Sequence, residues 1–256
     1  MKRIAIVGGA GRMGQILAQG LAAQGDFEVT ALVDVHEPHD RGGAIYVKSV
    51  DGLDPSNVDV VVDFSNPESV VATANWCAAN AVALVIGTTG LDPVQRAAVE
   101  RASASTAIVL AANFSLGAVL SERFAAQAAP YFDRVEVIEL HHDKKVDAPS
   151  GTSLAAVHAI VEARRSAHRA AIDEPTTRNT LEGSRGADAG DGVRVHSVRL
   201  PGLVAHQEIL FGGPGEGLTI RHDSFDRLSY VPGVALAIRS MPDAYGLTVG
   251  IDTFVR

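Results

Sequence analysis

The chain contains very little cysteine and no long apolar run. Cys77 is the only cysteine among its 256 residues, so a disulfide within the chain is excluded and a cytoplasmic location is expected. The apolar run from Ile4 to Val7 is too short for a secretory signal, and no stretch approaches the roughly 20 apolar residues that cross a bilayer. We therefore expect no membrane partner.

Positive charge is also scarce. Lys and Arg number 22 against 30 Asp and Glu, which gives a formal net charge of −8. Binding to a phosphate backbone depends on clustered Lys and Arg, so no nucleic-acid partner is expected, and any anionic ligand must meet locally concentrated positive charge. The remaining composition, 46% hydrophobic and 20% charged residues, is that of a globular protein with room for two unequal domains.

The first half of the chain alternates short β-branched runs with alanine-rich stretches. This pattern predicts a parallel sheet wrapped by helices, as in a Rossmann-like α/β domain. Strands are predicted at 3–7, 28–33, 58–64, 82–86 and 106–110, and helices at 12–24, 67–80 and 92–103. The stretch 35–56 is rich in Gly and Pro with little periodicity, so a loop is predicted there in place of one helical crossover.

The second half has a different rhythm, which predicts an α+β domain with an open mixed sheet. Helices are predicted from 115 to about 129, at 152–168 and at 231–240, and strands at 135–140, 193–199, 203–211, 217–222 and 247–251. The polar segment 170–192 is predicted to be an ordered excursion or a mobile loop. We expect one domain from 1–115 with 225–256, completed by the C-terminal tail, and a second from 116–224.

A glycine-rich turn lies between the first predicted strand and the first helix. It runs from Gly8 to Gly14 with glycine at its first, fourth and seventh positions, and Asp34 ends the second strand 20 residues later. Such a turn lets a pyrophosphate approach the amides of a helix N-terminus, and the acid can bind an adenosine ribose. The spacing differs from the usual Gly-x-Gly-x-x-Gly, so a strand-to-helix turn without a nucleotide is the alternative.

Two more turns of small residues follow strand ends, Gly87 to Gly90 and Ala111 to Ser115. Ligands on open parallel sheets bind beyond the carboxyl ends of the strands, where both turns would lie. Small side chains there would leave room for a nicotinamide ring, and the Asn113 amide could hold its carboxamide. A purely structural turn is the alternative for each.

The densest group of ionisable residues runs from Glu139 to Thr152 and reads Glu-Leu-His-His-Asp-Lys-Lys-Val-Asp-Ala-Pro-Ser-Gly-Thr. It combines candidate proton donors with a Ser-Gly-Thr turn that opens a helix, which is an anion site. The alternatives are a solvated surface loop and a metal site. A metal site is disfavoured because adjacent side chains of an extended segment point to opposite faces and neighbouring Lys repels a cation.

This segment resembles the signature of the dihydrodipicolinate reductase family, which is glutamate, any residue, two histidines and then Lys-x-Asp-Ala-Pro-Ser-Gly-Thr. The glycine turn, Gly-Thr-Thr-Gly, and Ala-Ala-Asn-Phe-Ser resemble that family's cofactor segments in the same order, as do Val204 to Glu208 and Thr219 to His222. The resemblance implies reduction of 4-hydroxy-tetrahydrodipicolinate to tetrahydrodipicolinate with loss of water, in diaminopimelate and lysine biosynthesis. It also implies a dinucleotide-binding domain, a substrate domain and a homotetramer built through the substrate-domain sheets.

Carried over position by position, the resemblance implies roles for individual residues. His141 and Lys145 would be catalytic, and the small cyclic dicarboxylate substrate would be bound by His142, Ser150, Gly151 and Thr152. NADH or NADPH would be bound by Gly8, Gly9, Ala10, Gly11, Arg12, Met13, Asp34, Gly87, Thr88, Thr89, Ala111, Ala112, Asn113 and Phe114. Some relatives carry Arg after the ribose acid, where it can hold a 2′-phosphate. This chain has Val35, which argues against a strong preference for NADPH.

Two other functions are compatible with parts of this pattern. One is a different nicotinamide-dependent reductase of a small dicarboxylate with the same fold. The other is a redox-sensing dinucleotide binder without enzymatic activity. A sensor has no need of His and Lys proton donors beside an anion site, so the segment from Glu139 to Thr152 favours an enzyme.

Overall fold

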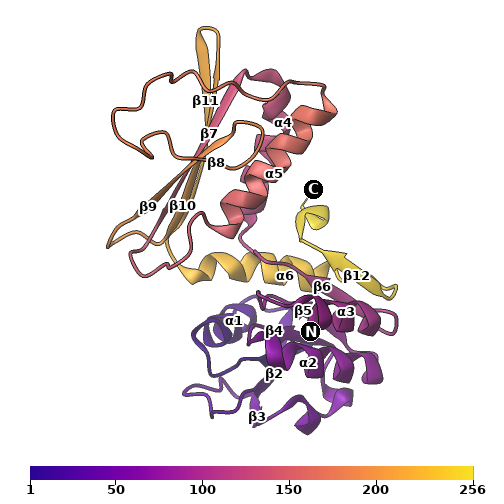
Figure 1. The fold of residues 1–256 in the computed structure, drawn as a ribbon. Coiled ribbons are helices and arrows are strands. Elements are labelled where there is room, and N and C mark those ends of the chain that lie inside the picture. The colour runs from indigo at the N-terminus through magenta and orange to yellow at the C-terminus, as the bar shows by residue number, and fades with distance from the viewer. Residues whose placement is uncertain (256) are drawn as a thin grey trace. The chain divides into compact units, whose positions relative to one another are not determined.

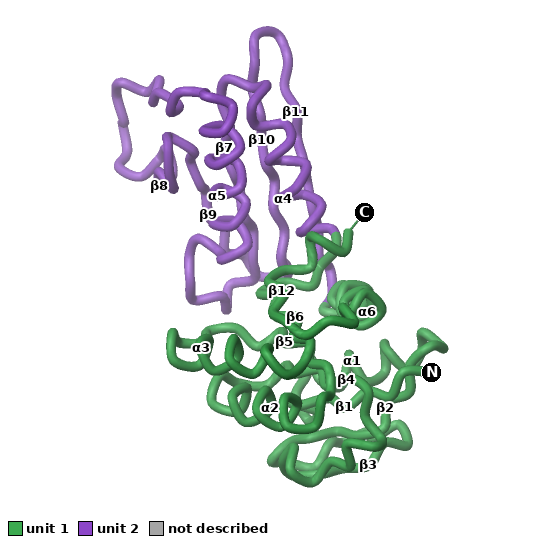
Figure 2. Tube along the Cα trace, turned by 90° about the vertical axis from the view of Figure 1, so that its right-hand side faces the viewer, with its two compact units in different colours: residues 1–116, 227–256 green, residues 117–226 purple. Residues whose placement is uncertain are grey.

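The computed structural model describes residues 1–255. Contacts within the chain divide it into unit 1, which is Met1–Leu116 with Arg227–Arg256, and unit 2, which is Gly117–Asp226 (Figure 2). Each unit has a sheet and a hydrophobic core of its own. No helix within residues 1–255 is long and apolar enough to cross a membrane.

Unit 1 is built on a parallel sheet of seven strands (Figure 1). Along the chain these are β1 (Lys2–Val7), β2 (Phe27–Val33), β3 (Ile45–Val47), β4 (Val60–Asp63), β5 (Ala83–Ile86), β6 (Ala107–Leu110) and β12 (Gly246–Val249). Their order in the sheet is β12-β6-β5-β4-β1-β2-β3. The central strands are almost continuously apolar because helices cover both faces of such a sheet. The predicted Rossmann-like domain is confirmed, and the strand near 247–251 joins its sheet beside β6.

Within residues 1–255, unit 1 has four α-helices, and two of them begin at a side-chain cap. The four helices are α1 (Arg12–Ala22), α2 (Pro67–Asn80), α3 (Pro93–Ala102) and α6 (Val231–Arg239), with short 3-10 turns η1 (Val50–Gly52), η2 (Pro55–Asn57), η4 (Arg227–Tyr230) and η5 (Asp252–Phe254). Asn66 accepts a hydrogen bond from the Ser69 amide at the start of α2, and Asp92 forms a capping box with Gln95 at the start of α3. In both helices proline occupies the first position, where the missing N–H is not needed.

The stretch 35–56 differs partly from its prediction. No helix links β2 to β3, as expected, but the stretch contains strand β3 and the turn η1, where only a loop was predicted. Strand β3 pairs with the carboxyl half of β2 through Ala31 to Val33. A strand of three residues is too short to show an alternating pattern in the sequence, so only the neighbouring edge of β2 reveals it.

Unit 2 has a mixed sheet, as predicted. It contains five strands in the order β11-β10-β7-β9-β8, of which the two-residue β8 was not predicted. Its elements are α4 (Leu116–Ala128), η3 (Ala129–Tyr131), β7 (Arg134–His141), α5 (Gly151–Ser166), β8 (Ala187–Asp188), β9 (Arg194–Arg199), β10 (Ala205–Gly213) and β11 (Glu216–Ser224). Strand β7 is parallel to β9 and antiparallel to β10. Alternate β7 residues Val135 and Val137 are buried in one core with Ile160 of α5, so one face of β7 points into that core.

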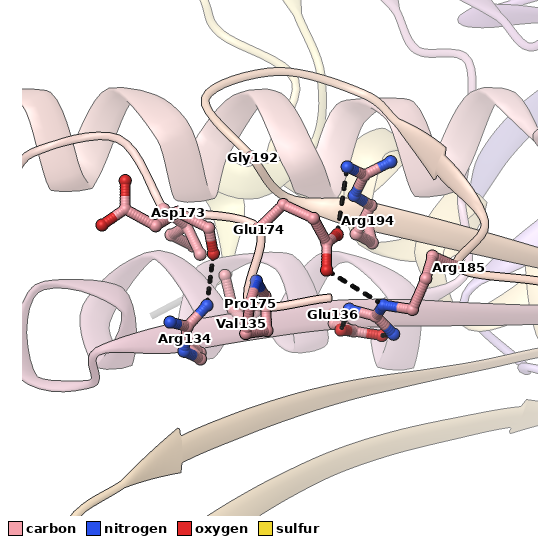
Figure 3. Close-up of a pocket in the computed structure, with 10 residues that line it drawn as sticks. Arg134, Val135, Glu136, Asp173, Glu174, Pro175, Arg185, Gly192 and Arg194 are labelled. Carbon is pink, nitrogen blue, oxygen red and sulfur yellow. Dashed lines mark hydrogen bonds and ion pairs between the residues drawn. The ribbon is translucent and has the colours of Figure 1, made fainter. Parts of the chain in front are cut away.

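The polar segment between α5 and β9 is an ordered excursion held by ion pairs. Arg185 contacts both Glu136 of β7 and Glu174, and Glu174 also contacts Arg194 (Figure 3). These residues line a cavity of about 30 Å³, a size that fits ordered water. Hydrogen bonds from Thr176 and then Arg185 lower the pKa of Glu174 to about 2, so it is ionised at neutral pH.

Candidate functional site

The glycine turn follows β1, at the carboxyl edge of the unit 1 sheet. Gly8 has φ +83°, and a Cβ there would lie 2.5 Å from the Phe64 carbonyl oxygen. A Cβ on Gly14 would lie 2.1 Å from the Gly8 carbonyl oxygen. Only glycine fits at these two positions, because the backbone of β1 runs directly against α1 and the end of β4. This packing places the first amides of α1 beside the turn, where an anion can bind them.

Asp34 lies against the same turn. Its Oδ2 accepts a hydrogen bond from the Ala10 amide at 3.0 Å, and its Oδ1 accepts one from the His36 amide at 3.1 Å. A carboxylate can accept further hydrogen bonds beyond these two, so ribose hydroxyls remain possible ligands. Val35 is 74% exposed beside it. The other residues predicted for this turn, Gly9, Ala10, Gly11, Arg12 and Met13, join β1 to the first turn of α1.

The turn after β5 is packed closely below the surface. A Cβ on Gly87 would lie 2.1 Å from the Phe64 ring, so a side chain there would displace the ring. The Thr88 hydroxyl is buried and donates to Asp63 at 2.8 Å, while Thr89 is exposed. Of the residues predicted to bind cofactor, Thr88 therefore has a structural contact, and Thr89 is available to a ligand.

The turn after β6 is similar. Ala111 and Phe114 are buried, and the Phe114 ring lies 5.5 Å from the Phe64 ring. The Asn113 side-chain oxygen accepts a hydrogen bond from the Ser115 amide at 2.9 Å, which fixes the turn, and Ala112 is exposed. The turn follows β6, which lies two places along the sheet from β4.

Asp63 is a buried acid that the sequence analysis missed. It ends β4 and is 0% exposed, and its Oδ1 accepts hydrogen bonds from Thr88 and from the Ser65 amide at 3.1 Å. Burial raises the pKa of Asp63, and the hydrogen bonds from Ser65 and Thr88 oppose that rise. An acid at the end of an all-valine strand is the signal that could have revealed it.

The candidate chemical centre lies where β7 ends in unit 2. Glu139 and His141 are two residues apart on β7 and therefore share a face, and His141 pairs with Arg199 of β9 in the sheet register. Arg199 donates to both Glu139 oxygens, at 2.7 and 2.8 Å. The Nδ1 atom of His141 is hydrogen-bonded to Glu139 Oε2. A carboxylate therefore joins an arginine to a histidine at this strand end.

The charges of this group are set by burial and by the ion pair. Burial opposes ionisation of Glu139, yet hydrogen bonds from Arg199, Ser197 and His141 outweigh it and lower the pKa of the carboxyl. Burial lowers the pKa of His141, the hydrogen bond to Glu139 opposes that change, and the positive charges of Lys145 and Arg199 add to it. At neutral pH the structure thus holds an ionised Glu139 and a neutral His141.

Lys145 lies on the loop between β7 and α5. Its Nζ donates to the Asp147 carboxylate at 2.8 and 2.7 Å, and its backbone amide donates to the His142 carbonyl at 3.1 Å. Asp147 is in turn held by Arg199, which donates to its carbonyl oxygen at 2.7 Å. Lys145 and His141 are close enough for the lysine charge to act on the histidine.

His142 and the start of α5 complete the predicted set. Among residues 1–255, His142 Nδ1 is one of two buried side-chain polar atoms without a hydrogen-bond partner. Ser150 is the N-cap of α5 and accepts from the Ser153 amide at 3.2 Å, so its hydroxyl is used within the helix end. Gly151 is exposed with open space around its Cα, and Thr152 is half-buried. Their amides belong to the first helical turn, which no helix satisfies internally.

Gln207 is a buried residue of the stretch Val204 to Glu208, for which the sequence predicted no individual role. It accepts a hydrogen bond from the Ser153 hydroxyl at 2.6 Å and so connects the start of α5 to β10.

All residues predicted for the cofactor lie in unit 1, and all those predicted for substrate and catalysis lie in unit 2. Within residues 1–255 no group of three or more His, Cys, Asp or Glu could hold a metal ion.

Both halves of the chain match models of one family. Residues 2–114 match the dihydrodipicolinate reductase N-terminus, and residues 117–253 match the dihydrodipicolinate reductase C-terminus. The chain belongs to the dihydrodipicolinate reductase family. The family's enzymes are oxidoreductases, and the Rossmann-like unit 1 with its glycine turn implies a nicotinamide cofactor for this member.

Curated family members are similar over nearly the whole chain. The 4-hydroxy-tetrahydrodipicolinate reductase of Corynebacterium diphtheriae is 42% identical over 99% of this chain and 98% of its own, and that of Nocardia farcinica is 46% identical over the same shares. The dipicolinate-bound dihydrodipicolinate reductase from Paenisporosarcina sp. TG-14 is 37% identical, with a TM-score of 0.86 and 99% coverage of both chains. An amine dehydrogenase from Mycobacterium smegmatis, 13% identical with a TM-score of 0.63, shares the fold alone.

Proposed function

We propose that this chain reduces 4-hydroxy-tetrahydrodipicolinate to tetrahydrodipicolinate with release of water, a step of diaminopimelate and lysine biosynthesis. One observation carries the proposal. The segment from the end of β7 to the start of α5 holds the proton-exchanging groups His141 and Lys145 together with a helix N-terminus that binds anions. A family member of known structure has dipicolinate bound, which is a ring dicarboxylate like the proposed substrate.

The substrate is a six-membered ring with two carboxylates, and unit 2 offers groups for them. The amides of Gly151 and Thr152 and the Thr152 hydroxyl lie at the positive end of α5, which favours a carboxylate. His142 Nδ1, which has no partner among residues 1–255, is a further hydrogen-bonding group for the same ligand. The hydroxyl of Ser150 supports this site by capping the helix.

Loss of the 4-hydroxyl as water leaves a conjugated imine, which needs one hydride at carbon 4 and one proton. A bound nicotinamide supplies the hydride. His141 and Lys145 supply or exchange the proton as electrons move toward the ring nitrogen, and the lysine charge stabilises the developing negative charge. Asp147 holds Lys145 in position through its carboxylate until substrate binds.

The residues of unit 1 fit a dinucleotide. The turn at Gly8 and Gly14 has no room for a Cβ at either position. Such a turn of bare backbone lets a pyrophosphate approach the first amides of α1 closely. Asp34 followed by the exposed Val35 favours a ribose with its 2′-hydroxyl over one with a 2′-phosphate, although Arg12 lies in the same turn. We propose that NADH serves at least as well as NADPH.

A coupled assay tests the reaction and the cofactor together. A synthase supplies the unstable substrate, and consumption of NADH and of NADPH is followed by absorbance. Oxidation that depends on the synthase product supports the proposal, and rates with NADH that match or exceed those with NADPH support the Asp34 argument. Binding of NADH without oxidation would favour the redox sensor, and oxidation only with another dicarboxylate would favour a different reductase.

We further propose that the enzyme is a cytoplasmic homotetramer assembled through the sheets of unit 2. Strand β11 lies at the edge of its sheet, is mostly exposed and carries Leu218 at 38% exposure. Long exposed edge strands tend to pair with other chains, so an assembly that covers β11 removes this liability. Light scattering during gel filtration tests the proposal, and a monomer mass at micromolar concentration contradicts it.

A further inference from the structure

We propose that Glu139 and Arg199 are positioning residues that hold His141 in the tautomer protonated on Nδ1, which leaves Nε2 as the nitrogen that exchanges the proton. The inference deepens the proposed function. It rests on that function only for the molecule that receives the proton, which is the bound substrate. The arrangement itself, a buried carboxylate between an arginine and a histidine, stands on the contacts alone.

The tautomer follows from counting donors and acceptors. Glu139 is 0% exposed, and each of its oxygens accepts a hydrogen bond from Arg199, so the group is an ionised carboxylate with acceptors only. A second acceptor, a deprotonated ring nitrogen, could not face the same carboxylate without repulsion. Because His141 contacts Glu139 through Nδ1, the proton of the neutral ring must lie on Nδ1.

Arg199 links this pair to the loop that carries the lysine. Its Nη2 donates to Glu139 Oε1 and also to the carbonyl oxygen of Asp147, each at 2.7 Å. Asp147 holds Lys145 through its carboxylate. One guanidinium therefore fixes the partner of His141 and the backbone that places Lys145. Its other terminal nitrogen, Nη1, donates to the second Glu139 oxygen, and a lysine at position 199 could not reproduce this two-nitrogen contact with the carboxylate.

Unit 2 contains a second group of the same three residue types, which serves as an internal comparison. Glu136, three residues earlier on β7, contacts Arg185 and His196 on the opposite face of the strand. There the histidine contact runs through Nε2, at 2.7 Å, and the Glu136 side chain is 31% exposed. The two groups differ in the ring nitrogen used, in burial and in distance from the predicted catalytic residues.

The first test needs no substitution. Histidine labelled with 15N in the wild-type protein gives different long-range correlations for rings protonated on Nδ1 and on Nε2, and the His141 signals are assigned by their absence in His141→Gln. We expect Nδ1–H for His141 at neutral pH. An Nε2–H ring would overturn the inference. Because no turnover is measured, this result stands whether or not the proposed reaction is correct.

The second test compares Glu139→Gln with Glu136→Gln. The amide at position 139 has one oxygen in place of two, so it loses one of the two hydrogen bonds from Arg199. With the oxygen toward Arg199 Nη2 and the NH₂ in the place of Oε2, the ring of His141 must accept at Nδ1 and carry its proton on Nε2. We expect kcat to fall by about 10²–10⁴-fold, as when a neighbouring carboxylate that sets a histidine tautomer becomes an amide, with KM changing by less than about threefold. Glu136→Gln should keep kcat within about twofold, because Glu136 contacts no predicted catalytic residue.

Either of two outcomes for Glu139→Gln overturns the inference: wild-type kcat, or a lowered kcat with His141 still protonated on Nδ1. If this variant does not fold, as judged by circular dichroism, Arg199→Lys replaces it. That variant keeps a positive charge beside Glu139 but loses the second nitrogen that contacts the carboxylate, so His141 should stay protonated on Nδ1 while kcat falls about tenfold because Glu139 is held less rigidly. A switch to Nε2–H, or an unchanged kcat, would contradict the role given to Arg199.

Discussion

Among residues 1–255 each unit has one fully buried acidic side chain, Asp63 at the end of β4 and Glu139 near the end of β7, and their pKa values shift in opposite directions. Asp63 in unit 1 accepts hydrogen bonds from Ser65 and Thr88, and burial raises its pKa. Glu139 in unit 2 is buried to the same extent, but hydrogen bonds led by Arg199 outweigh burial and lower its pKa. Asp63 anchors backbone turns, whereas Glu139 serves as a permanent negative charge beside a histidine.

The difference reflects what each unit must hold. The candidate cofactor turns are rich in glycine, alanine and threonine, so we expect them to meet a ligand mainly through backbone. The candidate chemical centre consists of titratable side chains. Two ion pairs, Glu139 with Arg199 and Lys145 with Asp147, are joined by the hydrogen bond from Arg199 to the Asp147 carbonyl oxygen. Substitutions in unit 1 should therefore act on cofactor binding, and substitutions at the β7 end should act on turnover. Four predictions test this division.

The largest effect is expected at His141 and Lys145. His141→Ala and Lys145→Ala should each reduce turnover by about two orders of magnitude or more, because a positioned general acid contributes 10²–10⁴-fold. The NADH dissociation constant should change by less than about threefold, and the double variant should be little worse than the poorer single one. Stopped-flow hydride transfer and NADH fluorescence titration measure both. Loss of NADH binding would instead assign His141 and Lys145 to the cofactor site.

At Gly8 we expect a substitution to weaken NADH binding, which the substitutions at His141 and Lys145 should leave almost unchanged. Gly8→Ala adds a Cβ at 2.5 Å from the Phe64 carbonyl oxygen at a positive φ, so the turn must shift and NADH binding should weaken by about 30-fold or more. Gly25→Ala is the matched control, since Gly25 has φ +77° with nothing within 4 Å of its Cβ position. Both should lose some stability, but only Gly8→Ala should lose NADH in calorimetry. Equal NADH affinities of the two variants would contradict binding of the cofactor at this turn.

Thr152 should affect the dicarboxylate alone. Thr152→Val removes the hydroxyl at the second position of α5, and we expect KM for the dicarboxylate to rise about tenfold, the value of a hydrogen bond to a charged partner. Thr152→Ser keeps the hydroxyl and should retain a KM within about twofold of the wild type. Steady-state kinetics at saturating NADH measure this. An unchanged KM in Thr152→Val would remove Thr152 from the site.

The smallest effect concerns the two carboxylates themselves. Asp63 has a raised pKa when folded, so wild-type stability decreases as pH rises above the unfolded value of about 3.9. Asp63→Asn removes that titration, so its stability relative to wild type should increase between about pH 4 and pH 8. Glu139→Gln should be less stable than wild type at both values, because Arg199 loses its counter-charge. Urea unfolding at the two pH values distinguishes them. If both variants gained stability relative to wild type as the pH rises, the two carboxylates would not differ in the way proposed.

The sequence allowed most elements to be predicted, and the exceptions share a cause. Strands and helices of four or more residues in unit 1 appear within a few residues of their predicted positions, because burial on a sheet or helix imposes a period that the chain itself shows. Strand β3 and the role of Asp63 were missed. Both depend on a neighbour far along the chain, β2 for the strand and Thr88 for the acid.

The sequence alone determined the glycine turns, the helix starts and the position of the candidate segment with His141, His142 and Lys145. Turn conformation and helix starts depend on residues only a few positions apart. The sequence could not determine that Arg199 would meet Glu139 and lie beside His141 in the sheet. That choice was made by the parallel register of β7 and β9, which sets His141 opposite Arg199 across 58 residues of chain. Register depends on the packing of whole strands into the core, so only the tertiary structure decided which charges meet.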